Sequence, residues 1–147
     1  MITHTHDIMR HDIERLIQSR RHCVLATVGD GLPYCSLMAY ATENDCARFL
    51  MATHRRTRKF QNIIRNPRVS LLIDSRETST PQALTIEGRG EEIIAEADRK
   101  TAAGLLLADH PGLADFVRHP DAVFVRVTAV SAVFLNGLTD AYYEKIA

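Results

Sequence analysis

Six short apolar segments separated by turn-forming residues constrain the fold of this chain more than any other feature. Their apolar, β-branched and aromatic residues favour strands. The predicted strands span residues 22–28, 33–42, 46–52, 68–74, 82–94 and 122–135. Short turns at 29–31 and 43–45 separate the first three strands, which predicts an antiparallel meander in sequence order. Strands and helices do not alternate regularly, so a parallel sheet of the β/α type is excluded.

Helices are predicted before and between these strands. Apolar residues recur at helical spacing over residues 7–20 and 53–65. Residues 96–108 are rich in Ala and Leu, which predicts a third helix, and residues 111–118 are expected to form a shorter helical turn. Asn66 and Pro67 end the second helix, because the residue before a proline avoids the α region. Gly88 and Gly90 indicate a bulge or bend in the fifth strand. The predicted class is mainly β (α+β), an antiparallel barrel with flanking helices, since closure removes unpaired strand edges.

Composition excludes several function classes. The 147 residues suit a single domain that needs no disulfide. Eighteen basic residues balance eighteen acidic ones, which disfavours a nucleic-acid partner. The three cysteines form no CxxC pair, no apolar run is long enough to cross a bilayer, and the polar N-terminus does not look like a secretory signal. We therefore expect a cytoplasmic protein with no nucleic-acid or membrane partner.

Motifs of metal-dependent and hydrolytic chemistry do not occur. There is no HExxH, no G-x-S-x-G and no Walker motif. His4, His6 and His11 lie near the N-terminus without accompanying cysteines, so we expect no metal site. A cysteine nucleophile with a histidine base stays open, although Cys23 and Cys46 are typical of strand core positions. No catalytic residue is identified.

The densest charge feature lies where the third strand gives way to a helix. Between Arg55 and Arg68 there are six basic residues and no acidic one. The first turn of a helix has free N–H groups and partial positive charge, and Arg58 and Lys59 would add charge-assisted donors there. This corner is suited to a phosphate. A solvated basic helix face is the equally open alternative.

One stretch of the chain is similar to a known family. In residues 46–74 a strand ends in Thr53, the triplet Thr57-Arg58-Lys59 opens a helix, and Asn-Pro-Arg-Val-Ser-Leu at 66–71 opens the next strand. This order resembles the pyridoxamine 5′-phosphate oxidase-like, FMN-binding split-barrel family. Weaker similarity covers residues 23–41 and 82–94, and residues 7–135 fit the family's order of elements.

The resemblance implies a split β-barrel homodimer with two FMN sites between the subunits. Arg58 and Lys59 would hold the FMN phosphate, and Thr53 and Thr57 would add hydroxyl contacts. Beside the isoalloxazine ring the resemblance puts Ser36, Leu37, Met38, Ala39 and Gln82. By strand alternation, Ser36 and Met38 would face opposite to Leu37 and Ala39. Residues 1–147 would form one FMN-binding domain, with 1–6 and 136–147 flexible or peripheral.

The expected function is an FMN-dependent oxidoreductase acting on a small molecule or NAD(P)H. It is not expected to be the vitamin-B6 oxidase itself, because the chain lacks Trp and has Tyr34-Cys35-Ser36 where an Arg usually stands. The alternative is a non-catalytic flavin- or haem-binding or electron-transfer protein on the same barrel. For haem, His54, His110 and His119 are the candidate ligands, and a deazaflavin in place of FMN also stays open.

Overall fold

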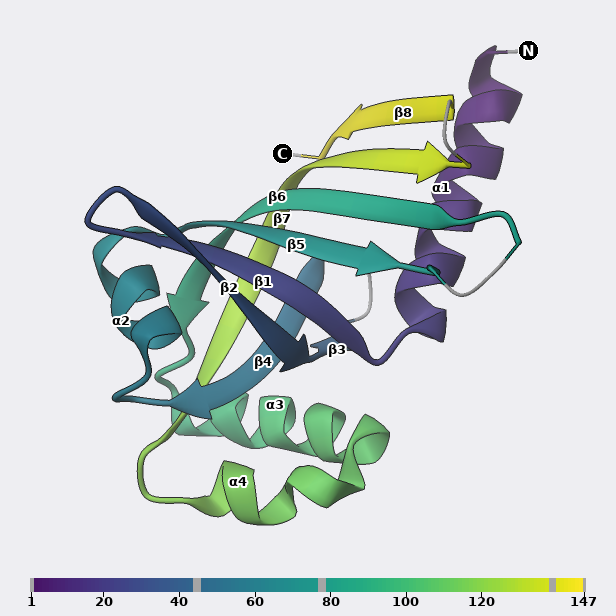
Figure 1. Ribbon diagram of the computed structural model, residues 1–147. Helices are drawn as coiled ribbons and strands as arrows, with labels where there is room; N and C mark the ends of the chain where they lie inside the picture. Colours follow the sequence, from purple (N-terminus) through teal and green to yellow (C-terminus); the bar gives the residue numbers. More distant parts are fainter. Residues whose placement is uncertain (1, 44–45, 77–78, 138–139, 147) are drawn as a thin grey trace.

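The computed structural model describes residues 2–43, 46–76, 79–137 and 140–146. Its elements follow one another as shown in Figure 1. They are α1 (Ile2–Ser19), β1 (His22–Gly29), β2 (Leu32–Ala39), β3 (Ala41–Thr42), β4 (Arg48–His54), α2 (Arg58–Arg65), β5 (Arg68–Asp74), β6 (Gln82–Glu92), α3 (Glu96–Asp109), the 3₁₀ turn η1 (Pro111–Leu113), α4 (Ala114–Arg118), β7 (Ala122–Asn136) and β8 (Asp140–Lys145).

The strands form one curled antiparallel sheet in the order β2-β1-β5-β6-β7-β4-β3, with β8 also paired to β7. Helices flank this sheet, with α3 and α4 below it and α1 along one side in the view of Figure 1. The structure is an antiparallel split β-barrel with flanking helices, as the sequence predicted. The interior holds one apolar cluster, and a second cluster lies between the sheet and α3.

The predicted meander of the first three strands forms only in part, because the predicted second strand, residues 33–42, is divided into β2 and β3 and only β3 pairs with β4. The β1–β2 hairpin forms, but β4 pairs with β7 and β3 and not with β2. Residues 49–53 of β4 are all buried, so this strand needs cover on both faces. Beside β7 both faces are covered. Phe49 and Met51 pack in the cluster inside the barrel, and Leu50 and Ala52 pack in the cluster between the sheet and α3. Turn-forming residues predict that the chain reverses direction, but they do not predict which distant strand the next strand pairs with.

Local signals were predicted more accurately. The β1–β2 hairpin turns on Asp30 and Gly31, whose φ angles of 54° and 75° are the positive pair of a two-residue type I′ turn. The register of β6 against β7 shifts between Glu87 and Gly88, which confirms the predicted bulge. Two segments carry more regular structure than predicted: α1 already begins at Ile2, and residues 140–145 form the edge strand β8.

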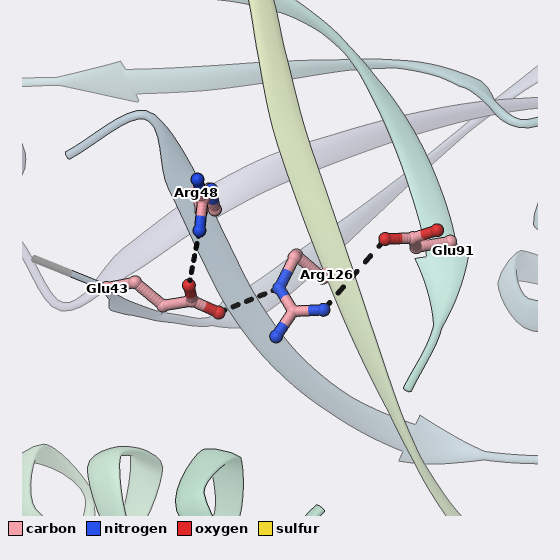
Figure 2. Close-up of polar contacts among 4 residues, drawn as sticks. All are labelled: Glu43, Arg48, Glu91 and Arg126. Atoms are coloured by element: carbon pink, nitrogen blue, oxygen red, sulfur yellow. Dashed lines mark hydrogen bonds and ion pairs between the residues drawn. The ribbon is translucent and has the colours of Figure 1, made fainter. Parts of the chain in front are cut away.

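An ionic network holds the turn after β3 against the sheet (Figure 2). The Glu43 carboxylate accepts from Arg126 of β7 at 2.7 Å and from Arg48 of β4 at 3.3 Å. Arg126 also lies 3.9 Å from a Glu91 carboxylate oxygen on β6. Arg126 is three-quarters buried, so its two carboxylate neighbours offset the cost of taking its charge out of water.

One buried hydroxyl fixes α1 to the barrel. Tyr40 lies between β2 and β3 and donates its hydroxyl proton to the Ile17 carbonyl at 2.5 Å. Both residues are buried, and desolvation raises the pKa of the Tyr40 phenol, which therefore stays a donor at neutral pH. Within the described residues no helix is long and apolar enough to span a membrane.

We predict that Tyr40→Phe lowers the free energy of unfolding by about 1–3 kcal/mol, because it leaves the buried Ile17 carbonyl without its donor. Urea denaturation of the variant measures this change. Ser79→Ala is the control, since Ser79 is exposed, and its loss should stay within about 0.5 kcal/mol. Equal losses in the two variants would show that the Tyr40 hydroxyl does not anchor α1.

Candidate functional site

The corner between β4 and α2 is built around the hydroxyl of Thr57. This hydroxyl donates to the His54 carbonyl at 2.8 Å and caps α2 by accepting the Phe60 N–H at 3.4 Å. Because its one proton is used, the 3.1 Å contact with the buried Thr53 hydroxyl has Thr53 as the donor. The structure therefore brings together the two threonines that the sequence singled out, with both protons engaged inside the corner.

Positive charge accumulates at this corner without a compensating acid. Arg58 and Lys59 form the first turn of α2, which contains no acidic residue. Arg55 is neutralised by Glu92 at 3.0 Å, but within the described ranges no carboxylate pairs with Arg56, Arg58 or Lys59. Cations at a helix N-terminus oppose the helix dipole, and the first helical N–H groups lack acceptors within the helix. An anion would relieve both conditions.

Tyr34 connects this corner to β2, and sequence reasoning did not select it as a site residue. The Arg58 guanidinium lies over the Tyr34 ring, 4.7 Å from its centroid. This cation–π contact directs the Arg58 guanidinium toward the strand that carries the other predicted site residues. Its one signal in the sequence was an aromatic residue just before the predicted site residues Ser36–Ala39.

A buried amide fixes the place of α2. Asn62, on the inner side of the helix, donates to the Thr27 hydroxyl of β1 at 3.0 Å. Gly29 allows this approach, since a Cβ there would come within 2.0 Å of the Asn62 amide oxygen. The close contact sets the position of the Arg58–Lys59 turn relative to the β1–β2 hairpin.

The side chains of β2 alternate as predicted. Met38 is buried in the barrel, whereas Leu37 is 74% exposed on the outer face. Ser36 lies on the same side as Met38, and its hydroxyl oxygen is buried without a hydrogen-bond partner in the described part of the protein. Buried polar atoms are nearly always satisfied, so this oxygen is a candidate ligand contact.

The backbone of β2 also has an open edge. Tyr40, which follows the strand, donates its N–H to the Arg21 carbonyl next to β1 at 3.2 Å. Backbone groups of alternate residues face the partner in an antiparallel pair, so those of Cys35, Leu37 and Ala39 face away from β1. Because β2 ends the sheet order, these groups line an edge to which a flat polar ligand can bind.

Gln82 lies apart from the corner between β4 and α2 within one chain. It pairs with Asn136 at one end of β7, whereas His54, at the corner between β4 and α2, pairs with Ala122 at the other end. Fourteen residues of β7 separate these pairs, or about 45 Å along the strand. Gln82 therefore does not reach the Arg58–Lys59 turn within one chain.

The open hypothesis of a cysteine nucleophile finds no support at Cys23. Burial raises the pKa of the Cys23 thiol to about 12, so it is protonated at neutral pH. No disulfide joins the three described cysteines. The described residues also contain no group of three or more histidine, cysteine, aspartate or glutamate side chains that could hold a metal ion.

Comparison with known proteins gives a consistent picture. Residues 9–135 match the sequence profile described as pyridoxamine 5′-phosphate oxidase. No curated protein sequence matches the chain. Among solved structures, a protein related to general stress protein 26 from Clostridium acetobutylicum, of the pyridoxinephosphate oxidase family, is 17% identical with a TM-score of 0.77. The match covers 93% of this chain and 94% of that one.

Two further structures share the fold and differ in their described ligands. An FAD-binding protein from Mesorhizobium loti is 21% identical with a TM-score of 0.69, over 82% of this chain and 89% of its own. A heme binding protein from Mycobacterium smegmatis is 17% identical with a TM-score of 0.78, over 89% of this chain and 55% of its own. At these identities the likeness shows the fold alone.

We predict that Thr57→Ala lowers the free energy of unfolding by about 1 kcal/mol, because it removes the cap of α2. Thr57→Ser keeps the hydroxyl and should restore most of the loss. Urea denaturation of the three proteins without ligand measures this effect apart from any cofactor. If Ser and Ala destabilise equally, the hydroxyl is not the group that holds the corner.

Proposed function

Because this chain belongs to the pyridoxamine 5′-phosphate oxidase family, we propose that it is an FMN-binding flavoprotein and acts as an oxidoreductase on a small molecule. The observation that carries the proposal is the uncompensated positive charge at the start of α2. Arg58 and Lys59 would bind the FMN phosphate together with the free N–H groups of the first turn. The doubly charged phosphate would offset both cations and the helix dipole.

The residues of β2 fit the rest of the cofactor. The strand begins beside the phosphate corner, through the contact of Arg58 with Tyr34, and runs away from it. Its outward backbone groups at Leu37 and Ala39 would meet the polar edge of the ring, and the buried Ser36 hydroxyl would find its missing partner there. Met38 would support this arrangement from the core.

FMN supplies the redox chemistry when bound, exchanging electrons with a small-molecule substrate or NAD(P)H. The chain's own residues would bind and orient it. Thr53 and Thr57 shape the corner, Tyr34 holds the Arg58 guanidinium in place, and the edge of β2 donates and accepts hydrogen bonds at the ring. A site built from cations, hydroxyls and backbone groups is suited to binding and orienting a cofactor that supplies the redox chemistry itself.

We also propose that two copies assemble through the outer face of the sheet. Strand pairing aligns one transverse row of side chains across six strands of this face, and the row is mostly apolar. It consists of Leu37, Val24, Leu72, Thr85, Val133 and Tyr143. No element of the described chain covers the exposed Leu37 and Tyr143. A second copy would cover this row and bring its own Gln82 toward the site.

The substrate we propose is not pyridoxine phosphate. The sequence Tyr34-Cys35-Ser36 stands where the family resemblance leads us to expect an Arg, and the Tyr34 ring is engaged by Arg58. The sequence also contains no Trp. We place the protein in the cytoplasm, where a reducing environment keeps its buried Cys23 thiol and exposed Cys35 thiol reduced.

Haem is the second candidate, favoured by the similarity to the heme binding protein. The three candidate axial ligands are engaged within the chain. His54 stacks between Phe116 and His119 with centroids 4.1 and 4.6 Å away, and the Nδ1 of His119 accepts the Asp121 N–H at 3.0 Å. His110 Nε2 contacts the Tyr40 carbonyl at 2.9 Å. These contacts favour FMN over haem.

We predict that Arg58→Ala combined with Lys59→Ala raises the Kd for FMN at least about a hundredfold, since two charge-assisted contacts to phosphate are lost. Riboflavin, which lacks the phosphate, should bind both proteins with similar affinity. Flavin fluorescence titration measures all four affinities.

The control for this charge change is Lys100→Ala with Arg118→Ala, two exposed cations on α3 and α4. It should leave FMN affinity within about twofold. An unchanged FMN affinity in the Arg58/Lys59 variant would contradict the phosphate assignment. A haem Soret band in protein that takes up no FMN would instead support the second candidate.

We predict that the protein sediments as a dimer, twice the 16.5 kDa chain mass, and that Val133→Glu makes it monomeric. The substitution would place a charge from each copy in the apolar row. Ile94→Glu is the control, because Ile94 is 78% exposed outside that row. Sedimentation velocity distinguishes the states, and a monomeric unmodified protein would contradict the proposed assembly.

A further inference from the structure

A cavity opens on the outer face of the sheet, where α1 ends and β1 begins. Its volume is about 350 Å³, at the lower end of the range for small-molecule sites. The C-terminal end of α1, the start of β1, the middle of β2 and the end of β5 enclose it. The lining residues are Ser19, Arg20, Arg21, His22, Cys23, Val24, Leu37, Leu72, Asp74 and Arg76.

The lining carries more positive than negative charge. Three arginines face one carboxylate, that of Asp74. Arg76 contacts Asp74 through Nε at 2.9 Å, which leaves the outer N–H groups of its guanidinium for another acceptor. Arg21 reaches Asp109, outside the lining, at 3.2 Å. The remaining cation is Arg20, which pairs with no carboxylate in the described part of the chain.

Arg20 gives an independent sign of a ligand. Its Nε atom is buried, and among the described residues no hydrogen-bond acceptor reaches it. A buried guanidinium N–H without an acceptor is costly, and such groups in folded proteins are nearly always satisfied. An anionic oxygen in the cavity would supply the acceptor, in the planar geometry that guanidinium groups share with phosphate and carboxylate.

The opposite wall of the cavity is apolar and belongs to the proposed flavin strand. Leu37 of β2, Val24 of β1 and Leu72 of β5 lie in register and form this wall. Leu37 is three residues beyond Tyr34, the contact of Arg58, or about 10 Å along β2. The cavity is thus separate from the phosphate corner and lies farther along the same strand.

We propose that this cavity binds the anionic group, a phosphate or carboxylate, of a small organic substrate whose apolar part lies against Leu37, between the two copies of the proposed dimer. Arg20 is its principal donor and Arg76 a second one. The anion site is inferred from the cavity and the buried Nε of Arg20, and it does not require a flavin. That the bound anion reacts with a flavin depends on the proposed function. Small organic anions are therefore the substrate class to screen.

Thermal unfolding of FMN-saturated protein tests this site, because FMN then occupies the phosphate corner. Inorganic phosphate and acetate are each compared with chloride at equal ionic strength and pH. At roughly ten times the Kd, the better anion should raise Tm by about 3 °C over chloride. The larger of the two shifts identifies the preferred anionic group.

The decisive variant is Arg20→Gln, compared with Arg118→Gln, an exposed cation on α4. Arg20→Gln should abolish the anion-dependent shift, and Arg118→Gln should retain it. Since each variant is compared with itself in chloride, a change in its basal Tm does not enter. No shift in the unmodified protein, or an equal shift in Arg20→Gln, would overturn the proposal.

The anion site can also be tested if the protein does not bind FMN. If the protein takes up no FMN, the same titration is made on the Arg58→Ala, Lys59→Ala variant, whose corner cannot compete for phosphate. A shift that still depends on Arg20 then supports the anion site and leaves the flavin proposal contradicted. Loss of the shift in that variant, with Arg20 intact, would assign the bound anion to the corner and overturn the cavity proposal.

Discussion

The continuous pairing of β7 is the constraint on which the rest of the structure depends. This strand pairs with β6 along almost its whole length, with β4 at one end and with β8 at the other. Hydrogen bonding on both sides lets so long a strand curve without exposing its polar backbone to the apolar interior. Its pairing with β4 sets where that strand ends at His54, and hence where α2 begins. The position of the corner between β4 and α2 is a consequence of this long-range register.

The positive charges of Arg58 and Lys59 lie at the N-terminus of α2, where the helix dipole is also positive. Two cations in the first turn of α2 cost stability in the absence of an anion, since they repel one another and the helix dipole. The surrounding contacts nevertheless hold the turn firmly, through the Thr57 cap, the Asn62–Thr27 bond and the Arg58–Tyr34 contact. A preorganised, locally unfavourable arrangement of this kind is typical of a binding site, because the ligand relieves the repulsion that the fold maintains.

Sequence reasoning succeeded where the signal is local. Asn66-Pro67 ends α2 as predicted, β5 spans the predicted residues 68–74, and the type I′ turn at Asp30-Gly31 follows from its composition. It missed the pairing of β4 with β7, which is decided by burial on both faces, because the nearby turn gives only the short β3–β4 pair. Tyr34 and Arg20 were not predicted as site residues, because their roles also depend on long-range contacts. Tyr34 contacts Arg58 of the later helix α2, and Arg20 lines a cavity formed by segments about fifty residues apart in the sequence.

The visible absorption spectrum of the purified protein, recorded after mixing with FMN and desalting, tests the central claim most directly. Binding at the corner between β4 and α2 predicts that the protein retains flavin absorbance equivalent to one FMN per chain, and that excess riboflavin treated in the same way is largely removed. A colourless protein after desalting, at FMN concentrations that saturate ordinary flavoproteins, would contradict the assignment of Arg58 and Lys59 to a flavin phosphate.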